Sequence, residues 1–210
     1  MIKDTSEHYL SVEEERLLLK IARESLETVV AKGESDVTAY NLTPALMEKH
    51  GAFVTLRCNG DLRGCIGYTS NHVSLADAVR ENAANAALHD LRFPRVTPGE
   101  LKDITIEISA LTPGDTHETP FKRVNHISEI VIGRDGLYIE RPPQRGGLLL
   151  PQVAIEQGWD VPEFLTAVCR KAGYHHEAWK APDAQLYRFS AQVFAEDRSD
   201  QTDQTDPTDQ

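Results

Sequence analysis

The amino-acid sequence predicts an α+β (α/β) fold in which helices flank a mainly antiparallel, mixed sheet. Two observations support this prediction. Strand-like segments are joined by tight hairpin signals at Asn59-Gly60 and Asp135-Gly136. The helical segments lie among these strands without the regular alternation of strand and helix that builds a parallel sheet. The chain has 210 residues, enough for one substantial core or for two lobes packed on each other.

Amphipathic periodicity, bounded by capping residues, predicts the helices. The first is the clearest, because Ser11 and Glu14 have capping-box spacing at its start and Gly33 suits its end. The helix after Ser74 carries a stripe of alanines that allows a close approach to a sheet. Asn82 lies beside this stripe and should hydrogen-bond on the buried side. The predicted helices span residues 11–33, 44–47, 75–89, 152–157 and 160–173.

Alternating and β-branched segments predict the strands. Residues 104–111 alternate between apolar and polar with a period of two, which is typical of a half-buried strand. Two hairpins are expected around the turn signals, and a last strand lies near the end of the apolar sequence. The predicted strands span residues 52–58, 62–67, 104–111, 130–133, 136–140 and 186–194.

The composition is that of an ordinary globular protein, with 40% hydrophobic and 26% charged residues. No apolar run approaches the roughly 20 residues that a membrane helix needs, and the first 15 residues do not form a signal peptide. Cys58, Cys65 and Cys169 form no CxxC pair, so a disulfide framework is not expected. We therefore expect a cytoplasmic protein without a membrane partner.

The net charge of −11 is concentrated partly in the C-terminal segment. Residues 196–210 contain six acidic residues and one arginine, with no apolar residue to offset the entropy of ordering, so a disordered acidic tail is predicted. It would keep the protein in solution or contact a basic partner. The acidic body disfavours general nucleic-acid binding, and with it a role as an RNA-binding accessory, although a local basic pocket is compatible with the sequence.

The stretch from Leu62 to Tyr68 carries most of the functional information. Alternate side chains on a strand face opposite ways, so Arg63 and Cys65 should point together, away from a core face formed by Leu62 and Ile66. An adjacent guanidinium favours a thiolate and should lower the pKa of the cysteine. This arrangement suits a nucleophile or an oxyanion site.

Glycines on both sides of this cysteine fit the same interpretation, because Gly64 and Gly67 leave room for a ligand to approach the backbone. The alternative is that helices cover both faces of the sheet and Cys65 is a small buried hydrophobe. No histidine lies in a local pattern that selects it as a base. No metal site is expected, since no HxH, HExxH or CxxC grouping occurs and His175-His176 is interpreted as a surface pair.

Two further segments contain candidate polar groups. Asp90 follows the C-terminus of a predicted helix, where a carboxylate is electrostatically disfavoured, and Arg92 is its natural partner. The pair belongs either to the site or to a local salt bridge that shapes the loop. The segment from Arg141 to Gly147 is basic and rich in glycine, a weak pattern for an anion-binding loop.

Four motifs resemble the AMMECR domain family, whose bacterial and archaeal members are called AmmeMemoRadiSam system protein A. The resemblance covers about residues 8–195 in order. It implies a single domain over residues 1–195, made of two lobes with a cleft between them, and places the acidic tail at 196–210 outside the family pattern. The motifs are Leu-Arg-Gly-Cys-Ile-Gly at 62–67, Asp-x-Arg-Phe-Pro at 90–94, Ile-Glu-Ile-Ser at 106–109 and Leu-Leu-Pro-Gln-Val-Ala at 149–154.

The family has no established activity, so the resemblance implies where a functional site lies and does not imply which reaction occurs there. Its genomic association implies a pathway shared with a Memo-type protein and a radical-SAM enzyme. Tyr68, Leu91 and Arg95 depart from the family pattern and would alter the shape of a pocket, without removing its charged and thiol groups. The positions that match family motifs are Arg63, Gly64, Cys65, Gly67, Asp90, Arg92 and Gln152.

Two hypotheses follow. In the first, the protein is an intracellular enzyme or enzyme subunit that acts on a small molecule, nucleotide or RNA base, with no cofactor of its own. Cys65 and Arg63 would be catalytic, and the substrate would contact Gly64, Gly67, Asp90, Arg92 and Gln152. In the second, the same surface belongs to an adaptor that docks a partner protein or binds a ligand without turnover. An open pocket with an accessible sulfur would favour the enzyme, and a sealed sulfur the adaptor.

Overall fold

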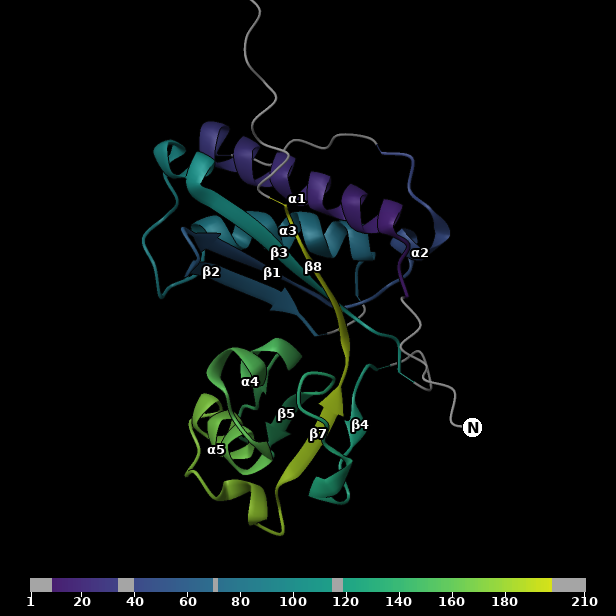
Figure 1. Ribbon diagram of the computed structural model, residues 1–210, viewed down its shortest axis with the longest axis vertical. Coiled ribbons are helices and arrows are strands. Elements are labelled where there is room, and N and C mark those ends of the chain that lie inside the picture. The colour runs from purple at the N-terminus through teal and green to yellow at the C-terminus, as the bar shows by residue number, and fades with distance from the viewer. Residues whose placement is uncertain (1–8, 34–39, 70–71, 115–118, 198–210) are drawn as a thin grey trace, which may run out of the picture.

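The computed structural model describes residues 9–33, 40–69, 72–114 and 119–197 of the chain. It has two lobes, each with a four-stranded sheet and helices packed against it (Figure 1). This arrangement confirms the predicted α+β class and the division into two lobes. All pairs among the named strands are antiparallel, and the strands are divided between two sheets instead of forming one.

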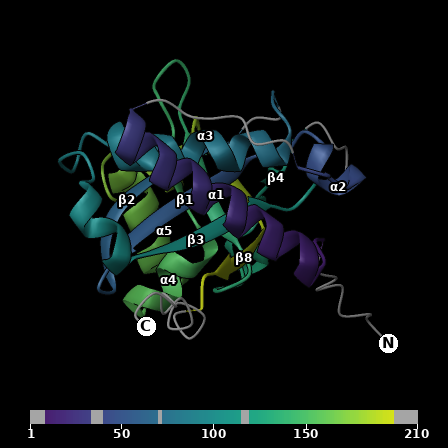
Figure 2. The same ribbon diagram turned by 90° about the horizontal axis from the view of Figure 1, so that it is seen from above.

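The first lobe is formed by both ends of the described chain. Its sheet has the strand order β2-β1-β3-β8, and helices α1 and α3 lie across one face of it (Figure 2). The core lies between these helices and the sheet. The elements are α1 (Val12–Lys32), α2 (Pro44–Met47), β1 (Ala52–Cys58), β2 (Asp61–Tyr68), α3 (Leu75–Leu88), a 3-10 helix (Pro98–Asp103), β3 (Ile104–Leu111) and β8 (Ala191–Ala195).

Local sequence signals determine these helices as predicted. The Ser11 hydroxyl accepts a hydrogen bond from the Glu14 amide, and the Glu14 carboxylate accepts one from the Ser11 amide, which confirms the capping box. Gly33 ends α1 in the left-handed region at φ 78°. Asn82 on α3 donates to the carbonyl of Ala52 at 3.1 Å, the buried hydrogen bond expected from its position.

The second lobe is inserted between β3 and β8. Its sheet has the strand order β4-β7-β5-β6, and Phe164 and Leu165 of α5 pack with Leu137 and Ile139 of β5 in its core. No helix of the described residues is both long and apolar enough to cross a bilayer. The elements are β4 (Lys122–Arg123), two 3-10 helices (Ile127–Glu129 and Ala178–Lys180), β5 (Gly136–Glu140), β6 (Gly147–Leu149), α4 (Pro151–Gln157), α5 (Val161–Lys171) and β7 (Gln185–Phe189).

The predicted hairpin at Asp135-Gly136 is wrong, because residues 130–133 form no strand and lead into a turn at 132–134. The buried carboxylate of Asp135 accepts a hydrogen bond from the Val131 amide at 2.8 Å, and the Asp135 amide donates back to the Val131 carbonyl at 3.0 Å. A side chain that binds the local backbone in this way competes with strand pairing. β5 pairs instead with β6 and β7.

The predicted last strand at 186–194 is two strands in different lobes. β7 pairs within the second sheet and β8 within the first, and only Ser190 separates them. The Ser190 carbonyl accepts a hydrogen bond from the Thr112 amide at 2.9 Å, which ties this crossing to the other connection between the lobes. The side-chain pattern favours strand on both sides of Ser190, so it does not reveal the change of sheet.

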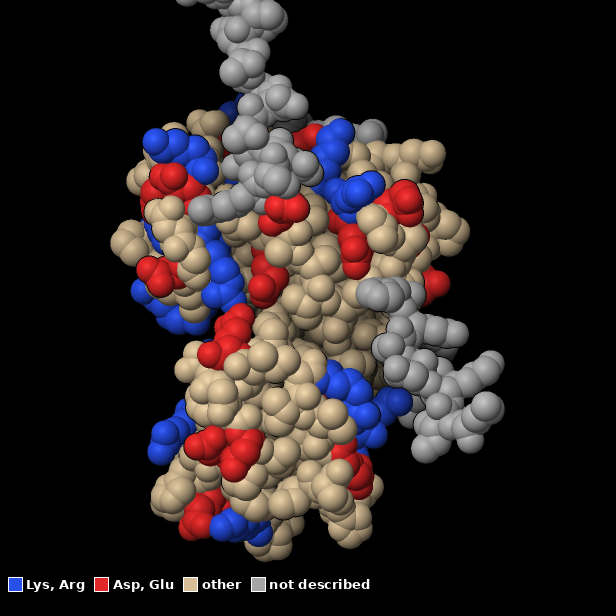
Figure 3. Space-filling view, in the orientation of Figure 1, with Lys and Arg blue, Asp and Glu red and all other residues tan. Residues whose placement is uncertain are grey.

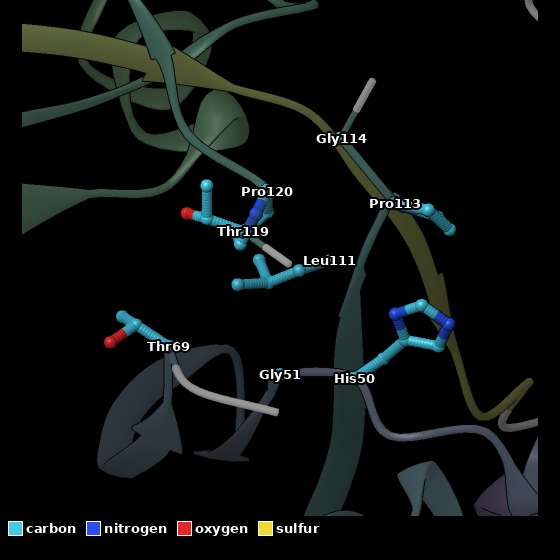
Figure 4. Close-up of a pocket in the computed structure, with 8 residues that line it drawn as sticks. All are labelled: His50, Gly51, Thr69, Leu111, Pro113, Gly114, Thr119 and Pro120. Carbon is cyan, nitrogen blue, oxygen red and sulfur yellow. The ribbon is translucent and has the colours of Figure 1, made fainter. Parts of the chain in front are cut away.

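The junction between the lobes is narrow in the space-filling view (Figure 3). Leu111, Leu150 and Phe189 form a small apolar cluster there. Beside it lies a pocket of about 10 Å³, with room for about one water molecule, where Leu111 projects between Thr69 and Thr119 (Figure 4). The two lobes are therefore joined by two chain crossings and a limited set of side chains.

Beyond the last strand, the described residues include Glu196, which the sequence analysis assigned to the tail. Its carboxylate binds the Arg23 guanidinium of α1 and accepts a hydrogen bond from the Ile106 amide at 2.9 Å. Glu196 therefore belongs to the first lobe. The prediction of disorder for the rest of the tail falls on residues 198–210, outside the described residues.

Candidate functional site

The motif strand β2 lies at the edge of the first sheet and contains a bulge. Leu56 pairs with Gly64 and the next residue, Arg57, pairs with Leu62, so Arg63 has no partner on β1. The extra residue reverses the side-chain alternation at that point. Leu62 is therefore 40% exposed and not in the core, contrary to the prediction.

Cys65 lies on the face of the sheet that is turned away from α1 and α3. It pairs with Thr55, whose neighbours Val54 and Leu56 are completely buried on the helix side. The Thr55 hydroxyl donates a hydrogen bond to the Cys65 sulfur at 3.3 Å. Cys65 is half-buried, so the predicted orientation of its side chain is confirmed and its sulfur is not sealed in the helical core.

Arg63 does not accompany Cys65, because the bulge directs it along the sheet edge. Its guanidinium donates to both carboxylate oxygens of Glu100, at 2.7 and 3.3 Å, and to the carbonyl of Pro94 at 2.9 Å. The side chain is 13% exposed. This pairing lowers the pKa of Glu100 to about 2. The expected electrostatic partnership between Arg63 and Cys65 is therefore wrong.

Asp90 and Arg92 hold the backbone of Cys65 from the open side of the edge strand. Asp90 accepts a hydrogen bond from the Cys65 amide at 2.9 Å, and Arg92 donates to the Cys65 carbonyl at 3.3 Å. The two side chains also bind each other, with N–O distances of 2.6 and 2.9 Å. Asp90 and Arg92 thus form the expected local salt bridge and also contact the motif strand. They supply hydrogen-bond partners for the amide and carbonyl of Cys65, which an edge strand would otherwise leave unpaired.

The environment of Cys65 favours the protonated form of its sulfur by raising its pKa. Burial raises the pKa of the Cys65 thiol, and the nearby Asp90 carboxylate raises it further. The Thr55 hydrogen bond and the charges of Arg92 and Lys171 act in the opposite direction without reversing the shift. The expectation of a lowered pKa is therefore wrong.

Protein atoms fill the space beside both motif glycines. A side chain at Gly64 would meet the Ala86 carbonyl of α3 at 2.3 Å, and one at Gly67 would meet the Phe53 ring at 2.1 Å. These glycines allow a helix and an aromatic ring to pack closely against β2. The expected room for a ligand at these two positions is therefore occupied.

Gln152 joins the same face of the first sheet from the second lobe. Its amide nitrogen lies 2.9 Å from a Glu107 carboxylate oxygen and 2.9 Å from the Ser109 hydroxyl, and it donates to both. Glu107 pairs with Thr55 across β1 and β3, which places this network beside Cys65. The Gln152 carbonyl oxygen is buried with no hydrogen-bond partner among the described residues. Cys65 and Gln152 thus share one surface between the lobes.

Sequence reasoning missed three members of this surface. Polar residues of β1 and β3 occupy alternate positions among buried apolar ones, so their common face could have been found from the period of two. The missed residues are Thr55, Glu107 and Ser109.

Within the described part of the chain, the Cys65 sulfur accepts a hydrogen bond from the Thr55 hydroxyl and makes none with a histidine. His175, His176 and Glu177 are all exposed, as expected of a surface pair, and their possible ligand atoms lie within 4.8 Å of one another. Lys180 binds the Glu177 carboxylate at 2.5 Å.

Comparison with known proteins identifies the family. The AMMECR1 family model matches residues 19–194. The chain belongs to the AMMECR1 family. A relative from Methanothermobacter thermautotrophicus is 45% identical over 188 residues, which are 90% of this chain and 97% of the relative. One from Thermofilum pendens is 40% identical and covers 89% of this chain and 92% of the relative.

The two-lobed fold is also that of a solved structure. The crystal structure of an uncharacterised protein from Pyrococcus horikoshii has 34% sequence identity and a TM-score of 0.84, covering 90% of this chain and 95% of the other. The resemblance noted from the motifs is therefore confirmed over nearly the whole folded part of this AMMECR1-family chain. Family membership leaves the activity open.

Proposed function

We propose that this AMMECR1-family protein is a cytoplasmic enzyme, or an enzyme subunit, whose substrate binds between the lobes beside Cys65. The observation that carries the proposal is the fixation of Cys65. Asp90 and Arg92 bind both of its backbone groups, while its side chain is only partly buried and lies on a polar face of the sheet. A cytoplasmic location is supported by the three unpaired cysteines of the described chain.

Cys65 acts in its thiol form, as a proton donor. A nucleophilic cysteine needs a base or a cation that makes it a thiolate, whereas burial here raises the pKa of the sulfur. A proton passes from the sulfur to a basic heteroatom of the substrate. The thiolate left behind is stabilised by the Thr55 hydroxyl and by Arg92, and it regains a proton from solvent.

The test combines thiol titration with a phenotype. The alkylation rate of Cys65 by iodoacetamide, followed by peptide mass spectrometry, should rise only at higher pH than that of an unstrained model thiol. Cys65→Ala should fail to complement a strain lacking the protein while retaining its melting temperature. Cys58→Ala, a half-buried thiol on β1, is the matched control. A normal titration of Cys65 together with full complementation by Cys65→Ala would overturn the proposal.

The pathway is a separate part of the proposal. The family resemblance supports a role alongside a Memo-type protein and a radical-SAM enzyme of the same genome. Co-expression of the three proteins should yield a complex, or a product that two of them do not yield. If adding this protein to the other two changes neither the complex that forms nor the products, the proposed role in their pathway is wrong.

The adaptor hypothesis is favoured by one specific observation. Leu91 is completely exposed between the two residues that hold Cys65, a position suited to contact with another protein. In an adaptor, Leu91→Asp abolishes binding to the co-expressed partner and Cys65→Ala leaves both binding and phenotype intact. In the enzyme, Cys65→Ala removes the phenotype whether or not Leu91 is changed.

A further inference from the structure

Two histidines and a glutamate form a cluster on the surface of the second lobe. His175, His176 and Glu177 are all exposed, and their possible ligand atoms lie within 4.8 Å of one another. The centroids of the two imidazole rings are 4.1 Å apart, and the rings are inclined by 40°. This histidine–glutamate cluster therefore presents two ring nitrogens and one carboxylate oxygen within reach of a single small ion.

The backbone is fixed on both sides of the cluster. Before it, the Tyr174 amide donates a hydrogen bond to the Cys169 carbonyl of α5 at 2.8 Å. After it, the amide of the buried residue Ala178 donates to the His175 carbonyl at 2.9 Å. A ligand bound here would thus require rotation of exposed side chains and little ordering of the main chain, which keeps the entropic cost of binding small.

The spacing of the cluster is close to that of a metal site. Zn²⁺ bonds to imidazole nitrogen at about 2.0–2.1 Å and to carboxylate oxygen at about 2.0–2.2 Å, so ligand atoms around a tetrahedral ion lie roughly 3.3 Å apart. The separations here reach 4.8 Å, and the ligand atoms must therefore approach one another by at most about 1.5 Å. A change of side-chain torsion angles is sufficient for such an approach.

Two local interactions compete with a metal ion. The Lys180 ammonium binds one oxygen of the Glu177 carboxylate at 2.5 Å, and the Glu177 amide lies 3.4 Å from Nδ1 of His175. Both partners of the ion pair are more than half exposed, so the pair contributes little, and the second contact is long for a hydrogen bond. The lysine lowers the pKa of Glu177 and so favours the charged carboxylate that a metal needs.

We propose that His175, His176 and Glu177 bind a divalent transition-metal ion, for which Zn²⁺ is the best match. Imidazole and carboxylate ligands suit zinc, whereas Mg²⁺ and Ca²⁺ prefer a set made of oxygen atoms. Three protein ligands with water in the fourth position form the open type of zinc site. The proposal replaces the expectation of a surface pair without a metal, and it does not depend on the role of Cys65.

The first test is zinc binding, measured at neutral pH by competition with a chromogenic chelator. Accessible thiols are first blocked with iodoacetamide, so that zinc held by cysteine does not contribute. One Zn²⁺ should bind per chain. His176→Gln and Glu177→Gln each remove one ligand and should weaken binding at least about tenfold. The matched control is His72→Gln, an exposed histidine of the first lobe, which should leave the affinity unchanged.

Lys180→Gln distinguishes the three-ligand site from simple binding by two histidines. The lysine competes for the Glu177 carboxylate, so its removal should raise the zinc affinity about threefold at low salt. Lys102→Gln removes the same charge from an exposed position of the first lobe and should have a much smaller effect. The gain from Lys180→Gln should shrink when it is combined with Glu177→Gln, because the carboxylate that it releases is then missing.

The variants change exposed side chains, so their melting temperatures should match that of the unchanged protein. Zinc affinity should also fall as the pH drops below about 6.5, where histidine becomes protonated. Zinc binding that is unaffected by His176→Gln would overturn the proposal. Binding that needs the histidines but is equally strong in Glu177→Gln would also overturn it, since it would show adventitious binding by a histidine pair.

Discussion

At the scale of single residues, Asp90 occupies an unusual position for a carboxylate. It follows the C-terminal end of α3, where the helix dipole is unfavourable to negative charge. Arg92 and the two amides of Cys65 and Arg92 compensate by hydrogen bonding, and they lower the pKa of Asp90 to about 2. The side chain is only 5% exposed, so these interactions are weakly screened.

The pKa of Asp90 leads to a pH-dependent prediction. Because its pKa in the folded state is lower than the ordinary value of 3.8, its contribution to stability is complete above about pH 4 and is lost as pH falls towards 2. Asp90→Asn should lower the free energy of unfolding by about 2 kcal/mol at pH 7. Urea unfolding at several pH values measures this difference, which should shrink below pH 4.

The control is Asp61→Asn, an exposed carboxylate at the start of β2, which should change stability by less than about 0.5 kcal/mol. A constant difference between Asp90→Asn and the unchanged protein from pH 7 to pH 2 would contradict the proposed role of the charge.

Cys65 and Arg63 show how far the sequence predicts the site. The side of the sheet that Cys65 faces follows from alternation and was predicted correctly. The direction of Arg63 depends on a bulge, and the bulge arises from pairing with β1, which the segment itself does not encode. The same is true of the thiol pKa, because burial is a property of the packed protein.

At the scale of elements, β2 and α3 are in unusually close contact. Small residues on both sides make this possible, since Gly64 faces the Ala86 carbonyl and the helix presents a stripe of buried alanines. The glycine that appeared to make room for a ligand instead brings the motif strand against a helix. The position of Cys65 therefore depends on this contact.

Gly64→Ala tests the contact. Its side chain would lie 2.3 Å from backbone atoms that cannot rotate away, so β2 must move, and we expect a loss of roughly 2–3 kcal/mol. Gly99→Ala is the matched control, since no atom lies within 4 Å of its added carbon. Urea unfolding and the near-ultraviolet circular dichroism of each variant provide the measurement. Equal stability of the two variants would contradict the close packing.

The helices were predicted well because their ends carry local signals. Ser11, Ser74 and Asp160 cap α1, α3 and α5 with their side chains as expected. Strands carry weaker signals, and the two errors share one cause. Residues 130–133 and the segment around Ser190 have suitable side chains for strands, but their partners are chosen by tertiary structure.

At the scale of the whole molecule, the site is composed of parts from both lobes. Cys65 and Arg92 belong to the first, and Gln152 belongs to the second. A motif in the sequence indicated Gln152, but nothing in the sequence shows that its amide binds Glu107 and Ser109 of the other lobe. Such a relation is set by the packing of the lobes.

The boundary of the folded body is also a property of the whole chain. Glu196 joins α1 to β3 through Arg23 and the Ile106 amide, and the Arg23 side chain is 16% exposed. Glu196→Gln should therefore destabilise the protein by about 1–3 kcal/mol. Glu27→Gln removes the other, exposed partner of Arg23 and should cost less than about 0.5 kcal/mol. Thermal unfolding of both variants measures the two losses of stability. Equal losses would show that Glu196 is not part of the folded first lobe.

The order of the strands has a consequence for synthesis. The first sheet needs β8, and β8 follows the entire second lobe in the chain. While a ribosome makes the protein from its N-terminus, β3 therefore emerges as an uncovered edge and stays so until residue 195 has been added. The whole second lobe must be synthesised before the first lobe is complete. The sheet whose first strands are made earliest is therefore completed by β8, the last strand to be made.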